Sequence, residues 1–140
     1  MFGNIVKLEN FRPFFNPILR NISVSSKLFA NNIFIVANDQ DFEDKVLKSQ
    51  KLLMVGFFEP YCNLCKMQLP RAEKIANEYK DKFSLAEVDI EQLTDVELKT
   101  VIKRIPSLAF YKNGKMSKEI LEGVREMEEI RNFVEQNIEK

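Results

Sequence analysis

The sequence predicts an α/β fold, with a central mixed sheet of parallel βαβ units and a C-terminal antiparallel hairpin, flanked by helices. From Ile33 onward, short apolar stretches alternate with amphipathic stretches of helical spacing, which is the pattern of βαβ units. The unbroken apolar run 52–58 is typical of a strand covered on both faces. Asn113-Gly114, between two further apolar stretches, is the strongest short signal for a hairpin turn.

Apolar spacing and capping residues place the elements of the first half. Asn and Asp are preferred helix caps, and the buried run 52–58 leads directly into residues with apolar positions at helical spacing. The predicted elements are a strand at 34–36, a helix from Asn38 or Asp39 to about Ser49, a strand at 52–58, a helix from near Cys62 and a strand at 83–88.

The second half is predicted from the same signals. Thr94 and Glu97 have the spacing of a capping box, and Leu98, Val101 and Ile102 form the buried stripe of a third helix. The remaining predicted elements are strands at 107–111 and 116–121 and a covering helix that carries Met127, Ile130, Phe133, Val134 and Ile138.

Residues 1–32 differ in composition from the rest of the chain. They contain four basic side chains and one acidic one, so their net charge is +3, whereas the 140-residue chain has a formal net charge of zero. Arg12, Arg20 and Lys27 interrupt every apolar run before it reaches the length of a signal-peptide core or a membrane span. We expect a basic N-terminal extension over 1–32 that acts as a mitochondrial-type transit peptide, removed between Arg20 and Asn32, followed by one domain over 33–140. The expected compartment is the matrix of a mitochondrion or related organelle; a cytoplasmic protein with a disordered tail is the alternative.

Composition excludes several kinds of site. Equal numbers of basic and acidic side chains, 21 each, give no electrostatic basis for binding nucleic acid or a membrane surface. The chain has no histidine and two cysteines, so a four-ligand zinc site would require a second chain. Lys66 stands where covalent haem attachment requires histidine, and a Cys-His or Ser-His pair is impossible. We expect no metal and no cofactor, which leaves redox chemistry or two inert thiols.

Cys62 and Cys65 have the spacing Cys-x-x-Cys, after a buried strand and at the predicted start of a helix. One helical turn separates them, so the two sulfurs can form a disulfide while the first faces solvent. The helix dipole and unpaired N–H groups lower the pKa of a thiol at this position. We therefore predict that Cys62 is the nucleophile that attacks a client disulfide, and that Cys65 resolves the mixed disulfide.

The motif also belongs to a longer pattern. Residues 55–66 read Val-Gly-Phe-Phe-Glu-Pro-Tyr-Cys-Asn-Leu-Cys-Lys, and further matches are Met67, Pro70, Arg-Ile-Pro-Ser at 104–107, Tyr-Lys-Asn-Gly at 111–114 and Gly123. In this register, residues 33–140 resemble the thioredoxin family. The resemblance implies a thioredoxin fold, reduction of disulfide-containing client proteins without a cofactor, and recycling by a thioredoxin reductase or similar electron donor. We expect a monomer.

The resemblance also implies a set of substrate-binding residues. The Ile105-Pro106 bond is expected to be cis and to lie beside the cysteines. Backbone groups of Ile105 are then placed to pair with an extended client segment in β fashion. Tyr61, which replaces the family's Trp beside the nucleophile, and Gly123 at the rim of the site complete the implied set.

Two departures from the family pattern leave the direction of catalysis open. Asn63-Leu64 replaces Gly-Pro between the cysteines, and this dipeptide influences the redox potential. Pro60 is more like the protein disulfide isomerase version of the motif, so an isomerase or oxidase is an alternative to the reductase. The absence of histidine between the cysteines favours the reductase.

Two further departures concern a buried charged pair. Gly56 stands where the family has a buried Asp, and Glu87 stands where it has the facing Lys. We predict that Glu87 supplies the missing carboxylate as a proton relay for Cys65, with a pKa raised by burial. The alternative is a Glu87 that reaches solvent at the strand end, and Glu59 is a second candidate carboxylate. The altered pair also keeps open a non-catalytic thioredoxin-like binding module within a larger assembly.

Overall fold

The structure, a computed structural model, describes residues 32–139. The predicted transit peptide and its cleavage site lie outside these residues, except for Asn32. The elements are β1 (Ile33–Val36), α2 (Asp39–Phe42), the π-helix η1 (Glu43–Leu47), β2 (Leu53–Phe58), α3 (Asn63–Glu78), β3 (Ser84–Asp89), the 3-10 helix η2 (Ile90–Gln92), α4 (Val96–Val101), β4 (Ser107–Lys112), β5 (Lys115–Glu122) and α5 (Met127–Ile138). No helix in this part of the chain is long and apolar enough to cross a membrane.

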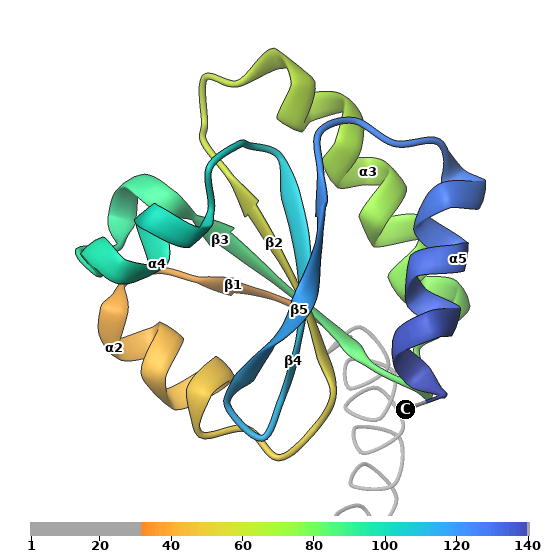
Figure 1. The fold of residues 1–140 in the computed structure, drawn as a ribbon, viewed down its shortest axis with the longest axis horizontal. Helices are drawn as coiled ribbons and strands as arrows, with labels where there is room; N and C mark the ends of the chain where they lie inside the picture. Colours follow the sequence, from red (N-terminus) through yellow and green to blue (C-terminus); the bar gives the residue numbers. More distant parts are fainter. Residues whose placement is uncertain (1–31, 140) are drawn as a thin grey trace, which may run out of the picture. The chain divides into compact units, whose positions relative to one another are not determined.

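The five strands form one mixed sheet in the order β1-β3-β2-β4-β5. β1 and β2 run parallel to β3, whereas β4 is antiparallel to both β2 and β5. Helices α3 and α5 cover one face of the sheet, and α2 and α4 cover the other (Figure 1). The predicted architecture, including the buried central strand and the C-terminal hairpin, is confirmed.

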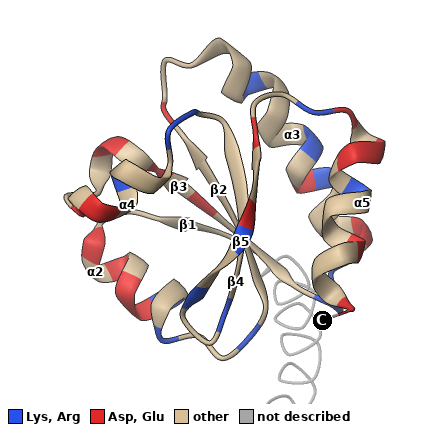
Figure 2. Cartoon of the chain, viewed as in Figure 1, with Lys and Arg blue, Asp and Glu red and all other residues tan. Residues whose placement is uncertain are grey.

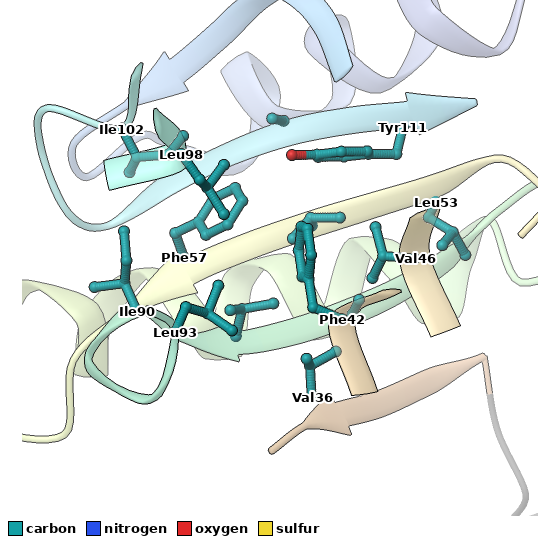
Figure 3. Packing of buried hydrophobic residues seen from close by; sticks show 14 residues of the cluster. Val36, Phe42, Val46, Leu53, Phe57, Ile90, Leu93, Leu98, Ile102 and Tyr111 are labelled. Atoms are coloured by element: carbon teal, nitrogen blue, oxygen red, sulfur yellow. The ribbon is translucent and has the colours of Figure 1, made fainter. Parts of the chain in front are cut away.

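Alternate residues of the strands fill two apolar cores on opposite faces of the sheet, as a side-chain period of two requires. Val55 and Phe57 pack toward α2 and α4, together with Phe42 and Leu98 (Figure 3). Met54 points to the other face, where the core includes Ile75, Phe110, Ile130 and Phe133. Charged side chains lie mainly on the helices and turns (Figure 2). Gly56 is two residues after Met54 and therefore faces the same side of the sheet. It lies beneath α3, the helix that begins at the cysteine motif.

The start of α4 differs from the prediction. Its N-cap is Asp95, whose carboxylate accepts from the Leu98 N–H at 3.0 Å, and not Thr94. Thr94 instead donates its backbone N–H to the Asp39 carboxylate at 2.9 Å, because the start of α2 lies beside it. The predicted capping box is therefore wrong: α4 has a single side-chain cap one residue later, at Asp95, and Val101, at 40% exposure, is not part of the buried stripe.

The hairpin between β4 and β5 turns at Asn113 and Gly114, as predicted. Their φ angles are +53° and +76°, the left-handed values that a two-residue Asn-Gly turn requires. A Cβ atom at Gly114 would also collide with the carbonyl group of Leu47. Glycine is therefore required here for both its backbone conformation and its small size.

Candidate active site

The cysteine pair lies at the N-terminus of α3 and forms a disulfide in the structure, with Cα atoms 5.2 Å apart. Cys62 is the N-cap residue, and its Sγ accepts a hydrogen bond from the Cys65 N–H at 3.1 Å. Cys62 is half-buried, whereas Cys65 is only 3% exposed. The outer sulfur is thus open to a partner molecule and the inner one is enclosed by the domain.

Helix α3 provides a favourable electrostatic environment for a thiolate at Cys62. It is 16 residues long, and its first turn contains no acidic side chain that would oppose the positive end of the helix dipole. The N–H of Cys65 already points at the Cys62 sulfur and can donate to its anion without rearrangement. These features are those of an activated nucleophile in a reactive dithiol.

The structure brings other predicted site residues to the cysteines. The Ile105-Pro106 bond is cis, as expected. Pro106 and Cys65 line the same small cavity, and the Gly123 N–H donates to the Pro106 carbonyl at 2.8 Å. Tyr61, immediately before the nucleophile, is 91% exposed. Pro106 therefore adjoins the inner cysteine, Gly123 is hydrogen-bonded to Pro106, and Tyr61 precedes the outer cysteine with an exposed aromatic ring.

A surface groove of about 260 Å³ adjoins this region and was not predicted from the sequence. Ile105 and Ile102 line it together with the charged residues Glu59, Lys103 and Arg104. The groove combines the start of the motif loop with the end of α4, which are distant along the chain. Glu59 thus contributes to this groove and is not among the residues that line the cavity behind Cys65.

Glu87 is buried, with 8% exposure, so the alternative in which it reaches solvent is wrong. It pairs in register with Gly56 of β2, on the sheet face that α3 covers. Burial, followed by a hydrogen bond with Glu73 of α3 and the charge of that residue, raises the pKa of Glu87 to about 7. Its contact is therefore with Glu73, and its role as a proton relay to Cys65 stays a prediction.

Behind Cys65 lies a cavity of about 10 Å³, lined among others by Gly56, Leu108 and Gln68. Gln68 is 1% exposed, and its Oε1 accepts from the Arg125 N–H at 2.9 Å. Its Nε2 has no hydrogen-bond partner within the described part of the chain. Sequence reasoning missed Gln68, although a glutamine three residues after Cys65 on the apolar face of a helix was a visible signal.

Comparisons with known proteins agree with this geometry. Residues 33–136 match the model of the thioredoxin family. The chain is 35% identical over 86 residues to thioredoxin of Acidithiobacillus ferridurans, covering 61% of this chain and 80% of that protein. It is 31% identical over 107 residues to thioredoxin of Buchnera aphidicola, covering 76% and 98% of the two chains.

Two further relatives extend the comparison. Mitochondrial thioredoxin of Bos taurus is 27% identical over 116 residues, covering 83% of this chain and 69% of that protein. The crystal structure of Malassezia sympodialis thioredoxin has a TM-score of 0.65 at 21% identity, covering 76% of this chain and 93% of that one, and it supports the fold. The predicted protein-disulfide reductase is confirmed. The match of residues 33–136 to the family model, together with a disulfide at the start of a helix in a five-stranded sheet, shows that this chain belongs to the thioredoxin family of thiol-disulfide oxidoreductases.

Proposed function

We propose that Cys62 and Cys65 perform the exchange in two steps. The Cys62 thiolate attacks a client disulfide and forms a mixed disulfide, while one client sulfur leaves as a thiolate. The Cys65 thiolate then attacks the Cys62 sulfur, the bond to the client breaks, and the second client sulfur leaves, so two electrons pass to the client. The observation that carries this assignment is the contrast between Cys62, an accessible N-cap residue held by a backbone N–H, and the enclosed Cys65.

Reduction of insulin by dithiothreitol tests these roles. We expect the oxidoreductase to accelerate the reaction, Cys62→Ser to abolish the acceleration, and Cys65→Ser to accumulate a mixed disulfide that mass spectrometry detects. Ser84→Ala, at the start of β3 and outside the residues that line the cavity behind Cys65, is the control. A wild-type protein that gave no acceleration would support a binding module, and an active Cys62→Ser variant would refute the assignment.

The client-binding surface in this proposal consists of Tyr61, Ile105, Pro106 and Gly123. The exposure of Tyr61 and the hydrogen bond that joins Gly123 to Pro106 beside Cys65 support it. An extended client segment would add to the backbone of this region, which gives affinity with little sequence preference. We expect Tyr61→Ala to raise KM for insulin several-fold with little change in the reaction of Cys62 with a small disulfide. An equal loss toward both substrates would contradict a role in client binding.

The proton path in this proposal involves Glu87. Cys65 must lose its proton before it attacks, and a buried carboxyl with a pKa of about 7 is suited to accept it at neutral pH. Glu87 lies in register with Gly56, which lines the cavity behind Cys65. We expect Glu87→Gln to slow the decay of the mixed disulfide while leaving its formation unchanged. An unchanged decay rate would exclude the relay.

The cellular setting in this proposal is the matrix of a mitochondrion or related organelle, where a thioredoxin reductase or similar donor returns the monomer to its dithiol form. The basic composition of residues 1–32 and the similarity to a mitochondrial thioredoxin support it. Fusion of residues 1–32 to a fluorescent protein tests it. We expect import and cleavage between Arg20 and Asn32, and abolition of import when Arg12, Arg20 and Lys27 are replaced by Glu. A cytoplasmic fusion protein would support the alternative.

A further inference from the structure

Gln68 has a buried side-chain amide whose oxygen is hydrogen-bonded and whose nitrogen is not. Its Oε1 accepts the Arg125 N–H at 2.9 Å, and this bond sets the orientation of the amide, because a backbone N–H requires an acceptor. The opposite end, Nε2, has no partner among the described residues although the side chain is only 1% exposed. A buried N–H donor without an acceptor is costly, so a native protein that retains one invites a functional explanation.

The unpartnered amide lies on the helix face that carries the resolving cysteine. Gln68 follows Cys65 by three residues in α3, a spacing that makes side chains neighbours, and helical side chains lean toward the N-terminus. Both residues line the same cavity of about 10 Å³, which is at the lower limit for one water molecule. The disulfide form has no hydrogen bond between the amide and the sulfur, and the small cavity leaves little space for a bridging water once the disulfide opens.

Few other acceptors are available in this cavity. Gly56, Leu108 and Pro106 have apolar side chains or none. The Ser107 hydroxyl donates to the Arg104 carbonyl and keeps its acceptor lone pairs, so Ser107 and the Cys65 sulfur are the side-chain acceptors among the other lining residues, and neither bonds Nε2 in the disulfide form. A disulfide sulfur is a weak acceptor, whereas a thiolate is a strong one that gains a charge-assisted hydrogen bond. The partner of Nε2 is therefore expected only in one redox state.

We propose that Nε2 of Gln68 donates a hydrogen bond to Sγ of Cys65 once the disulfide opens, which makes Gln68 a positioning residue for the resolving step. The proposal rests on the assignment of Cys65 as the resolving thiol. The amide favours the thiolate that attacks Cys62, and it releases that sulfur when the Cys62–Cys65 bond forms and the client thiolate leaves. It supplies no proton and no electrons, so the balance of the exchange is unchanged.

Titratable groups near Cys65 also affect its pKa, and their effect must be separated from that of Gln68. The cavity residues of β2 and β4 do not titrate. On the same sheet face, β3 contributes Glu87 and α3 contributes Glu73, and Cys62 itself is the adjacent thiol. An ionised Glu87 opposes the Cys65 thiolate, whereas the Gln68 amide favours it. The two residues therefore shift the Cys65 pKa in opposite directions. Measuring the effect of Gln68→Met in a Glu87→Gln protein separates the two contributions.

The decisive variant is Gln68→Met, which removes the donor and keeps a similar volume. In the reduced protein, labelled cysteine Cβ resonances report the Cys65 pKa by NMR. We expect the substitution to raise that pKa by about one unit and to slow mixed-disulfide resolution up to about tenfold at neutral pH. The first attack by Cys62 should be unchanged, and Gln92→Met, at an exposed glutamine, is the matched control. A folded Gln68→Met protein with a wild-type Cys65 pKa would overturn the proposal, because a purely structural role affects stability only.

A measurement on the wild-type protein avoids the risk that the variant does not fold. The side-chain amide resonances of Gln68 are followed in the oxidised and the reduced protein as a function of pH. We expect them to move on reduction and to titrate with Cys65. Amide resonances that are identical in both states would refute the hydrogen bond. Failure of the proposed cysteine roles is distinguishable, since it appears as a Cys65→Ser protein that accumulates no mixed disulfide, whatever the amide reports.

Discussion

The ionisation of Glu87 should make the domain less stable as the pH rises through neutrality. Its pKa in the folded protein is about 7, whereas the ordinary value for a glutamate is 4.5. Below pH 4.5 the group is protonated in both the folded and the unfolded chain and has no effect. Between pH 4.5 and 7 only the unfolded chain loses the proton, so unfolding becomes progressively more favourable. Above pH 7 the full penalty applies.

The magnitude follows from the difference between these two pKa values. Each unit corresponds to about 1.4 kcal/mol, so the carboxylate reduces the free energy of unfolding by roughly 3 kcal/mol at alkaline pH. Glu87→Gln removes this penalty, because the amide cannot ionise and still has a hydrogen-bonding partner in Glu73. The variant should therefore gain stability over the wild type between pH 4.5 and 8.5, by an amount that approaches this value.

Urea unfolding of the oxidised protein at pH 4.5, 6, 7 and 8.5 measures the effect, with tyrosine fluorescence as the probe because the chain has no tryptophan. Glu119→Gln, at an exposed position of β5, controls for the loss of one carboxylate. Parallel pH profiles for the wild type and Glu87→Gln would refute the reasoning, since they would mean that Glu87 ionises equally easily in the folded and the unfolded chain.

Three further substitutions test local features by the same unfolding measurement. Asp95→Ala removes the cap of α4 and should cost about 1 kcal/mol, and an unchanged free energy of unfolding would contradict the assignment of this cap. Gly56→Ala should be neutral or stabilise by about 0.5 kcal/mol, because the nearest atom to its Cβ is the end of the Leu108 side chain at 3.4 Å and the other neighbours are at ordinary contact distance; a large loss would show that the strand does not tolerate it. Gly114→Ala should cost more than about 1 kcal/mol, since the left-handed φ of +76° disfavours a Cβ, and an unchanged urea midpoint would contradict the turn geometry.

Much of the fold was predictable because its signals are local. The apolar run of β2 and the Asn113-Gly114 turn each depend on residues that are adjacent in the chain. The cap of α4 was placed wrongly for the opposite reason. Thr94 has the correct residue type for a cap, but the Asp39 carboxylate, 55 residues earlier in the chain, binds it, and Asp95 takes the role.

The active site likewise has features that depend on neighbouring residues and features that depend on distant ones. The spacing of Cys62 and Cys65 and the residue types around them were sufficient to identify a dithiol at a helix start, because one helical turn fixes the distance between the sulfurs. The hydrogen-bond partners of the buried polar side chains could not be predicted in this way, because they lie far away in the sequence. The contact of Glu87 with Glu73 joins β3 to α3, and the contact of Gln68 with Arg125 joins α3 to the segment before α5.

The sequence by itself determined that this protein carries a Cys-x-x-Cys pair at the start of a helix on a mixed α/β sheet, since periodicity, turn residues and motif spacing are properties of neighbouring residues. Only the tertiary structure decided what surrounds Cys65. Packing of α3 against the sheet closed a cavity next to Gly56, held Glu87 away from water and left the NH2 group of Gln68 without a partner among the described residues. Burial and hydrogen-bond satisfaction depend on which distant segments meet, and that information is distributed over the whole folded chain.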